Sequence, residues 1–558
     1  MKPASSARWR GIRTLSLVGF LLAGMAQALA IAWPGNGQAL WWLQLLSLAA
    51  LVWQLDALMA PDLTAATTPV ATVEAPGVAP AWRAAFLGGW IFGTAWLGGT
   101  FWWLFISMYT YGGLAAPLAA FAVFALAAAL GLYYAVACAC FVAFAPTRWL
   151  WRTIFFAALW TLAELVRGNW FTGFPWGASG YAHVDGPLVL FASQVGVYGV
   201  GAVAALIAAS IAHCVRLDYR HRANWLAPIG LSICLCAAAL GSGVVVDAFP
   251  STARSLPVRN SAGQLQVALL QGNIPQDEKF VPGGGIASAL TWYGSQLRDA
   301  TASLVVTPET ALPLLPAQLP PGYLEAIATR YTSGTQAAIV GMPLGDGGGE
   351  YSNSVVGFRP DIPGDANTQN WRYDKHHLVP FGEFVPGVFR WFTNMMRIPL
   401  GDFRRGGLAQ APFVWQGQRI AVNICYEDLF GEEIGANFKD EAGSPTVLLN
   451  VSNIAWFGDS IAIDQHLAIS RMRSLEFQRP MLRATNTGAT VVIDHHGRVT
   501  QSLPRLTRGV LVAEVEGRYG RTLYARWVAR FGLWPLWGAA LLIVAVTVMF
   551  RLRRPFAR

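Results

Sequence analysis

Charged residues are scarce in this chain of 558 residues, because Asp, Glu, Lys and Arg together make up only 13% of it. Ordinary soluble domains contain roughly 25% charged residues. Apolar residues make up 54%, and they include 24 Trp and 30 Phe, more than a water-soluble chain of this length would readily bury. The shortage of charge therefore argues against an ordinary soluble protein and predicts a membrane protein.

Acidic residues are scarcer than basic ones, with 31 Asp and Glu against 40 Lys and Arg, so the formal net charge is +9. A basic total can indicate nucleic-acid binding. Here, however, the Arg and Lys residues cluster at the ends of apolar runs, which is the distribution that orients a membrane protein. We therefore expect a membrane-embedded protein with no nucleic-acid partner.

Cysteine is also scarce, with six residues, and five of them lie in or beside apolar runs (Cys138, Cys140, Cys214, Cys234 and Cys236). Only Cys425 lies in a polar stretch, so no disulfide framework and no metal-type cysteine spacing is available there. The pairs His376-His377 and His495-His496 lack accompanying ligands. We predict no metal and no cofactor, and a free thiol at Cys425 that is either a small buried hydrophobe or a functional group.

Long apolar runs divide the chain. Most are long enough for a transmembrane helix, which needs roughly 20 apolar residues; the run with Glu164 is the shortest. They predict about eight spans, at 12–32, 38–59, 84–106, 114–145, 149–166, 189–213, 225–247 and 531–550. The predicted organisation is a transmembrane domain (1–249), a mixed domain (250–530), and a final helix with a basic tail (531–558).

The arginine distribution predicts the orientation. With a cytoplasmic N-terminus and alternating spans, every basic cluster falls on the cytoplasmic side (Arg83, Arg148, Arg152, Arg216, Arg220, Arg222, Arg551, Arg553, Arg554 and Arg558), as the positive-inside rule requires. Both termini are then cytoplasmic, and the mixed domain lies outside. The basic start and the Ala28-Leu29-Ala30 pattern could belong to a cleaved signal peptide, but the long apolar run favours a retained anchor.

The mixed domain has the pattern of an α/β fold. Short apolar or β-branched runs predict strands at 265–270, 303–306, 337–340, 420–424, 446–451, 490–493 and 509–515, and a helical pattern covers 463–478. Strands that alternate with helices indicate layered α/β packing.

Three stretches of this domain could carry chemistry: VVTPETA over 305–311, YDKHHLVPFGE over 373–383, and VNICYED over 422–428. Cys425 ends a predicted strand before a predicted helix, whose dipole would lower the pKa of the thiol. Lys375 would add to that effect, and Glu309 could accept the proton. Taken singly, a Glu after a proline is usually a turn residue, and a Lys beside two His is usually solvated.

Together the three stretches resemble the Glu-Lys-Cys triad of the nitrilase (carbon–nitrogen hydrolase) superfamily, and with the predicted spans they resemble the apolipoprotein N-acyltransferase family. Further similar stretches lie at 173–177 (GFPWG), 271–276 (QGNIPQ), 450–453 (NVSN), 455–460 (AWFGDS), 471–473 (RMR) and 479–480 (RP). The resemblance implies an α-β-β-α sandwich outside the cytoplasm, joined to a transmembrane helical bundle.

The resemblance also implies residue roles. Glu309 would be the general base, Lys375 would stabilise the oxyanion, and Cys425 would be the acylated nucleophile. The other family-like positions are Glu383, Glu427, Tyr426, Asn353, Trp456 and Phe280, and the last is a departure, because the family pattern has Trp there. Stacking area survives that change, but the indole N–H donor does not.

The implied reaction is ping-pong transfer of an acyl chain from a phospholipid, through a Cys425 thioester, to the N-terminal amine of a diacylglyceryl-modified apolipoprotein, at the periplasmic face of the bacterial inner membrane. The aromatic and Met residues of 389–400 fit lipid access or an ordinary buried helix equally well. The alternatives are a membrane-anchored amidase with the same triad and a non-enzymatic transporter or scaffold.

Overall fold

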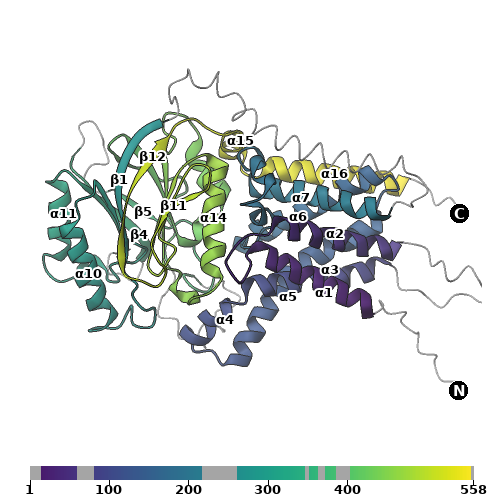
Figure 1. Ribbon diagram of the computed structural model, residues 1–558, viewed down its shortest axis with the longest axis horizontal. Coiled ribbons are helices and arrows are strands. Elements are labelled where there is room, and N and C mark those ends of the chain that lie inside the picture. The colour runs from purple at the N-terminus through teal and green to yellow at the C-terminus, as the bar shows by residue number, and fades with distance from the viewer. Residues whose placement is uncertain are drawn as a thin grey trace, which may run out of the picture.

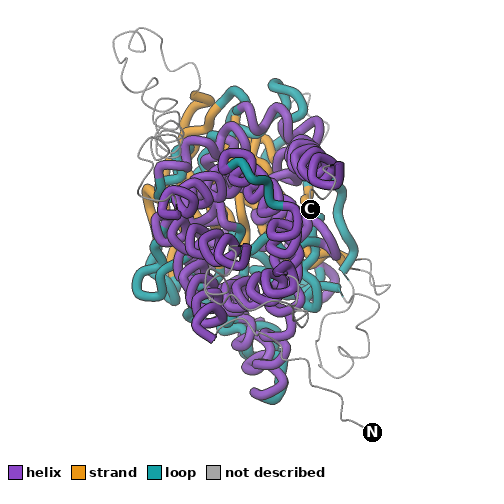
Figure 2. Tube along the Cα trace, turned by 90° about the vertical axis from the view of Figure 1, so that its right-hand side faces the viewer, coloured by secondary structure: helices purple, strands orange, loops and turns teal. Residues whose placement is uncertain are grey.

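Two regions lie side by side in the computed structural model, a helical bundle and an α/β domain (Figure 1). The structure describes residues 14–59, 81–216, 261–345, 351–361, 371–384 and 403–553. Viewed along the bundle, the helices lie in front of the strands (Figure 2).

The bundle consists of apolar helices. They are α1 (Thr14–Ile31), α2 (Trp41–Met59), α3 (Ala81–Phe101), α5 (Ala116–Phe144), α6 (Trp149–Asn169), α7 (Ala192–Arg216) and α16 (Trp534–Arg553). Among the described residues, five helices are long and apolar enough to cross a membrane, or six if a bent pair forms one span. The predicted segment 225–247 lies outside the described residues, so the count of eight spans stays a prediction.

Two predicted spans differ in detail. The run at 84–106 is not one straight helix, because the chain bends by 61° after α3 into α4 (Leu104–Ile106) and the π-helical η2 (Ser107–Tyr111). The indole N–H of Trp103 donates to Gln465 of the α/β domain at 3.0 Å, which holds the bend against that domain. The run at 149–166 extends to Asn169, and the Glu164 carboxylate within it accepts hydrogen bonds from the backbone N–H and the hydroxyl of Ser179.

The α/β domain contains two six-stranded sheets, in the orders β12-β1-β2-β3-β4-β5 and β11-β10-β9-β8-β7-β6. The first sheet consists of β1 (Ser261–Gln271), β2 (Leu304–Val306), β3 (Ala337–Gly345), β4 (Tyr351–Phe358), β5 (Arg372–Asp374) and β12 (Gly509–Arg518). The second consists of β6 (Phe413–Trp415), β7 (Gln418–Ile424), β8 (Val447–Ser452), β9 (Met481–Thr485), β10 (Val491–Ile493) and β11 (Val499–Ser502). Strands β1, β2 and β3 pair in parallel, as do β7, β8 and β9.

The sheets pack face to face around buried Val, Leu and Ile side chains from both. Helices α10 (Gly285–Asp299) and α11 (Tyr323–Thr332) pack on the other face of the first sheet. Helix α14 (Ala462–Phe477) lies between the second sheet and the bundle, within a core that includes bundle residues (Figure 1). The predicted α-β-β-α sandwich beside a helical membrane region is confirmed.

Polar contacts join α14 to the bundle. Gln465 accepts hydrogen bonds from the indoles of Trp103 and Trp176, at 3.0 and 2.7 Å. Glu476 accepts the backbone N–H of Val197 at 2.7 Å. Gly196 has φ 68° and breaks α7 directly before Val197, so the Glu476 carboxylate caps the longer part of a bundle helix. The bundle and the domain thus share one interior.

Candidate active site

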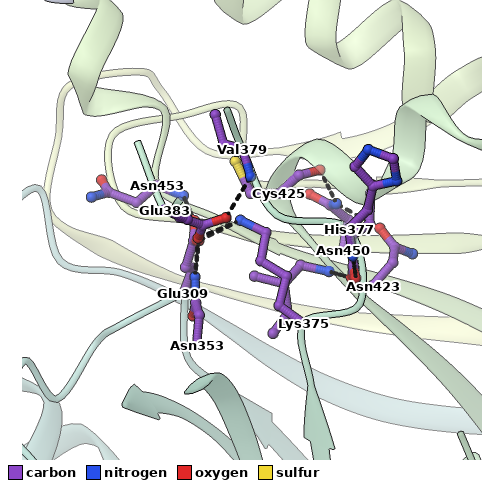
Figure 3. Close-up of polar contacts among 12 residues, drawn as sticks. Glu309, Asn353, Lys375, His377, Val379, Glu383, Asn423, Cys425, Asn450 and Asn453 are labelled. Atoms are coloured by element: carbon purple, nitrogen blue, oxygen red, sulfur yellow. Dashed lines mark hydrogen bonds and ion pairs between the residues drawn. The ribbon is translucent and has the colours of Figure 1, made fainter. Parts of the chain in front are cut away.

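Glu309 follows β2, at the carboxyl end of a parallel strand. It is 8% exposed, and its carboxylate accepts three hydrogen bonds (Figure 3). Asn353 Nδ2 and Lys375 Nζ donate to one oxygen, at 2.7 and 3.3 Å, and the backbone N–H of Asn453 donates to the other at 2.8 Å. Burial opposes the charge, but Lys375 and the Asn353 hydrogen bond outweigh it and hold the pKa of Glu309 below its ordinary value. Glu309 is therefore ionised and can accept a proton.

Lys375 follows β5 and is 1% exposed. Its backbone N–H donates to the carbonyl of Asn353 at 2.8 Å. Its ammonium lies 2.8 Å from Glu383 Oε1 and 3.3 Å from Glu309 Oε1. Burial alone would lower the pKa of Lys375, but the two carboxylates outweigh burial and raise it. The group is therefore a permanent cation.

Asn353 and Glu383 complete this network. The Asn353 amide donates to Glu309 and to Glu383, at 2.7 Å each. Glu383 also accepts the backbone N–H of Val379 at 2.9 Å. An amide that bridges two carboxylates fixes both around the lysine, so Asn353 and Glu383 position the charged groups.

Cys425 lies at the end of β7, directly after Ile424, with the left-handed φ of 52°. Its carbonyl oxygen accepts hydrogen bonds from Asn450 Nδ2 at 3.0 Å and from His466 Nε2 at 3.2 Å. Non-glycine residues adopt such a φ only where the surroundings impose it. The two donors thus hold a sharp turn that places the thiol near Glu309, Lys375 and Glu383 (Figure 3).

The prediction of a lowered thiol pKa is wrong. Burial and the Glu309 carboxylate raise the pKa of Cys425 to about 12, although Lys375 and Ser452 act in the opposite direction. The expected helix after Cys425 is one short 3₁₀ turn, Cys425–Leu429, so few peptide dipoles act on the sulfur. The thiol at rest is therefore protonated and needs a base at the moment of attack.

Glu427 and Tyr426 hold the nucleophile turn from two sides. Glu427 is buried and accepts hydrogen bonds from the Tyr373 hydroxyl and from the backbone N–H groups of Ile424, His376 and His377. It therefore joins the cysteine turn to the lysine loop. Burial raises the pKa of Glu427 to about 7, whereas its four donors favour the carboxylate. Tyr426 donates to the Gly173 carbonyl of the bundle region at 3.1 Å.

Phe280, which follows Lys279, and Trp456 are both half-buried. The Trp456 ring contacts that of Tyr111, at the end of the bent helix pair, with ring centroids 5.8 Å apart. Asp277, three residues before Phe280, interacts electrostatically with Tyr111. The segments that carry Phe280 and Trp456 therefore lie beside Tyr111 of this helix pair. The predicted lipid-access segment 389–400 lies outside the described residues.

Sequence similarity extends over both regions. Residues 266–524 match the carbon–nitrogen hydrolase family, and residues 23–210 match the N-terminal domain of apolipoprotein N-acyltransferases. The chain is 55% identical, over 92% of each chain, to the apolipoprotein N-acyltransferase of Verminephrobacter eiseniae. It is 42% identical to that of Ralstonia nicotianae, over 95% of this chain and 93% of the relative. The chain belongs to the apolipoprotein N-acyltransferase family.

Among solved structures, the chain also matches an amidase of the nitrilase superfamily from Nesterenkonia. It is 18% identical, with a TM-score of 0.34, and the match covers 51% of this chain and 99% of the amidase.

Two of the residues that contact Glu309 were not predicted as part of the site. Asn453 donates its backbone N–H to Glu309, and its side-chain amide donates to Gln276 at 2.7 Å. In the sequence it is distinguished only as part of the family-like stretch 450–453. Lys279 is 3% exposed and lies 3.3 Å from the backbone carbonyl of Glu309. Nothing in its sequence context distinguishes Lys279, because it follows Asp277 and Glu278 in what resembles a solvated turn.

Proposed function

We propose that this protein transfers an acyl chain from a phospholipid to the N-terminal amine of the lipid-modified cysteine of apolipoproteins. The observation that carries the proposal is the buried arrangement of Glu309, Lys375 and Cys425, at the side of the α/β domain where the bundle packs. Family membership supports it, since the relatives from Verminephrobacter eiseniae and Ralstonia nicotianae carry this activity in their names. We further propose that the domain lies on the periplasmic side of the bacterial inner membrane, with both termini in the cytoplasm, as the arginine distribution indicates.

The first half-reaction acylates the thiol. Glu309 takes the proton of Cys425 while the sulfur attacks the ester carbonyl carbon, and the carbonyl electron pair moves to oxygen beside the Lys375 ammonium. The intermediate collapses when the bond to the glycerol oxygen breaks. That oxygen takes the proton from Glu309 and leaves as a lysophospholipid, and a thioester remains on Cys425.

The second half-reaction forms an amide. The neutral α-amine of the diacylglyceryl-modified cysteine attacks the thioester carbon and gives a proton to Glu309. The carbon–sulfur bond then breaks, and the sulfur takes that proton back. Transfer to an amine, and not to water, requires a shielded site, and the bundle beside Cys425 supplies one side of that shield.

The test follows the acyl group. Full-length protein in detergent, given phospholipid alone, should accumulate a hydroxylamine-sensitive acyl group on Cys425, and a diacylated lipopeptide should discharge it into an amide with ping-pong kinetics. Cys425→Ala should abolish both steps, and Cys140→Ala in helix α5 is the matched control. Glu309→Gln should block acylation, because the thiol then lacks a proton acceptor. Release of free fatty acid at one rate, with or without lipopeptide, would instead identify a hydrolase.

A further inference from the structure

Lys279 is a buried ammonium that the triad mechanism does not use. It is 3% exposed, and its Nζ donates to the Glu309 backbone carbonyl at 3.3 Å. Among the described residues, no carboxylate side chain forms an ion pair with it. The ring centroid of Phe280 lies 5.9 Å from Nζ. A buried lysine with so few partners is costly, which suggests that its charge has a use.

The loop that carries Lys279 is fixed in place. Asn453 Nδ2 donates to Gln276 at 2.7 Å, and Asn486 Nδ2 donates to the Ile274 carbonyl at 2.8 Å. Asn486 also accepts the backbone N–H of Ile274 at 3.0 Å. Since Asn453 binds Glu309 as well, the lysine and the proposed base are held by one rigid set of contacts. The position of Lys279 is therefore built into the site.

The balance of charge gives this lysine a role. Glu309 and Glu383 are two carboxylates around the single ammonium of Lys375. With Lys279 included, two negative charges face two positive ones. When the thiol proton moves to Glu309 and an oxyanion forms on the substrate, the sum is still zero. Without Lys279 the sum would be −1 throughout, so the oxyanion would form in a negatively charged, poorly solvated site.

Lys279 also interacts electrostatically with the reacting groups themselves. Burial lowers the pKa of Lys279 to about 8, although Glu309 and Cys425 act in the opposite direction. In return, Lys279 contributes to the lowered pKa of Glu309. The lysine is therefore mostly protonated at neutral pH and acts on both partners of the proton transfer.

We propose that Lys279 is a second cation of the active site, a positioning residue that neutralises the excess carboxylate around Lys375 and stabilises the Cys425 thiolate as it forms. The inference rests on the proposed function of the site as a cysteine nucleophile with Glu309 as its base. Lys375 is then free to stabilise the substrate oxyanion, since Lys279 offsets one of its two carboxylates.

The experiment compares Lys279→Met and Lys279→Arg with the wild type, and uses Lys439→Met as the control because Lys439 is exposed. The rate of alkylation of Cys425 by iodoacetamide is followed by peptide mass spectrometry of the full-length protein. A rise of one unit in the thiol pKa reduces the thiolate about tenfold. We expect Lys279→Met to slow alkylation at about pH 7, where Lys279 is protonated, by about that factor, with Lys279→Arg and Lys439→Met within about twofold of the wild type.

A second measurement is the pH dependence of single-turnover acylation by phospholipid alone. The wild-type rate constant should fall as the pH rises through about 8, where Lys279 loses its proton, and Lys279→Arg should keep its rate to higher pH, because arginine stays protonated. Lys279→Met should lower the rate constant about 10- to 100-fold with an unchanged KM for phospholipid.

Two results would overturn the inference: alkylation of Lys279→Met at the wild-type rate, or alkylation of Lys279→Arg as slow as that of Lys279→Met, since the charge would then be irrelevant. If Lys279→Met does not fold, Lys279→Gln replaces it with the same expectation. Alkylation requires no acyl donor, so it tests the role of Lys279 independently of the proposed acyl transfer. Absence of an acyl-enzyme in the wild type would overturn the proposed function instead.

Discussion

The two helical layers of the α/β domain differ in what lies on their far side. Helices α10 and α11 cover the first sheet and leave residues such as Ala287, Thr291 and Arg298 exposed. Helix α14 covers the second sheet, and its opposite side packs against the bundle, so it is buried along nearly its whole length. A helix between two interiors cannot follow the usual amphipathic pattern. Its polar residues must instead find partners across the interface.

Those partners make the docking of the domain specific. Gln465, Arg473 and Glu476 are each at most 2% exposed, and the contacts of Gln465 and Glu476 include groups of the bundle region. Apolar packing alone would tolerate sliding, whereas buried hydrogen bonds fix one arrangement. The comparison therefore predicts that replacing polar residues of α14 lowers the stability of the protein far more than equivalent replacements on α10.

The largest effect is expected for Arg473→Met. Arg473 pairs with Glu476 at 3.0 Å, and both side chains are fully buried. Removing one partner of a buried ion pair costs about 3–5 kcal/mol, which should appear as a large drop in the thermal midpoint of the detergent-solubilised protein. Arg298→Ala on α10 is the control, expected within about 0.5 kcal/mol. Similar losses for the two variants would remove the distinction between the layers.

Gln465→Leu should have the next largest effect. It leaves the indole N–H groups of Trp103 and Trp176 without their common acceptor, and an orphaned buried donor costs about 1–3 kcal/mol. Thermal unfolding would measure the loss, with Gln296→Leu on α10 as the control. A stability unchanged by Gln465→Leu would show that the bend after α3 is held by packing alone.

The smallest effect is expected for Tyr426→Phe, which removes one hydrogen bond, to the Gly173 carbonyl. The loss should be about 1 kcal/mol, together with a several-fold slower acylation of the adjacent Cys425 in a single-turnover assay. If Tyr426→Phe loses this stability but keeps full activity, the bundle anchors the domain at this point without positioning the nucleophile.

Much of the fold could be predicted from sequence, because most strands are plain apolar runs. All seven predicted strands are present, but β4, β5, β6, β9 and β11 were missed, and β4 and β9 show a physical reason. The buried side of β4 carries Ser352 and Ser354, which bond to Asp374, and β9 carries Arg483, which is buried against Asp428. A polar side chain whose hydrogen-bond or ion-pair partner lies far away in the sequence cannot be assigned to the core from its sequence neighbours alone.

The site was predictable in residue type but not in electrostatics. Glu309 and Cys425 each end a parallel strand, and the three motifs name the residues that cluster there. The thiol pKa depends on burial by chain segments far away in sequence, and Lys279 looks like a turn lysine until the loop is folded. Short-range patterns therefore located the chemical groups, whereas the field that acts on them is a property of the whole domain.

The cap that Glu476 provides for α7 has a consequence for biosynthesis. The Val197 N–H and its acceptor are 279 residues apart, so at about 5–20 residues per second the ribosome needs roughly 15–55 s to synthesise the chain between them. During that interval the start of the helix lacks its final acceptor. The nascent bundle must therefore persist in an unfinished form, and the last capping bond of this membrane helix can form only after most of the catalytic domain has been translated.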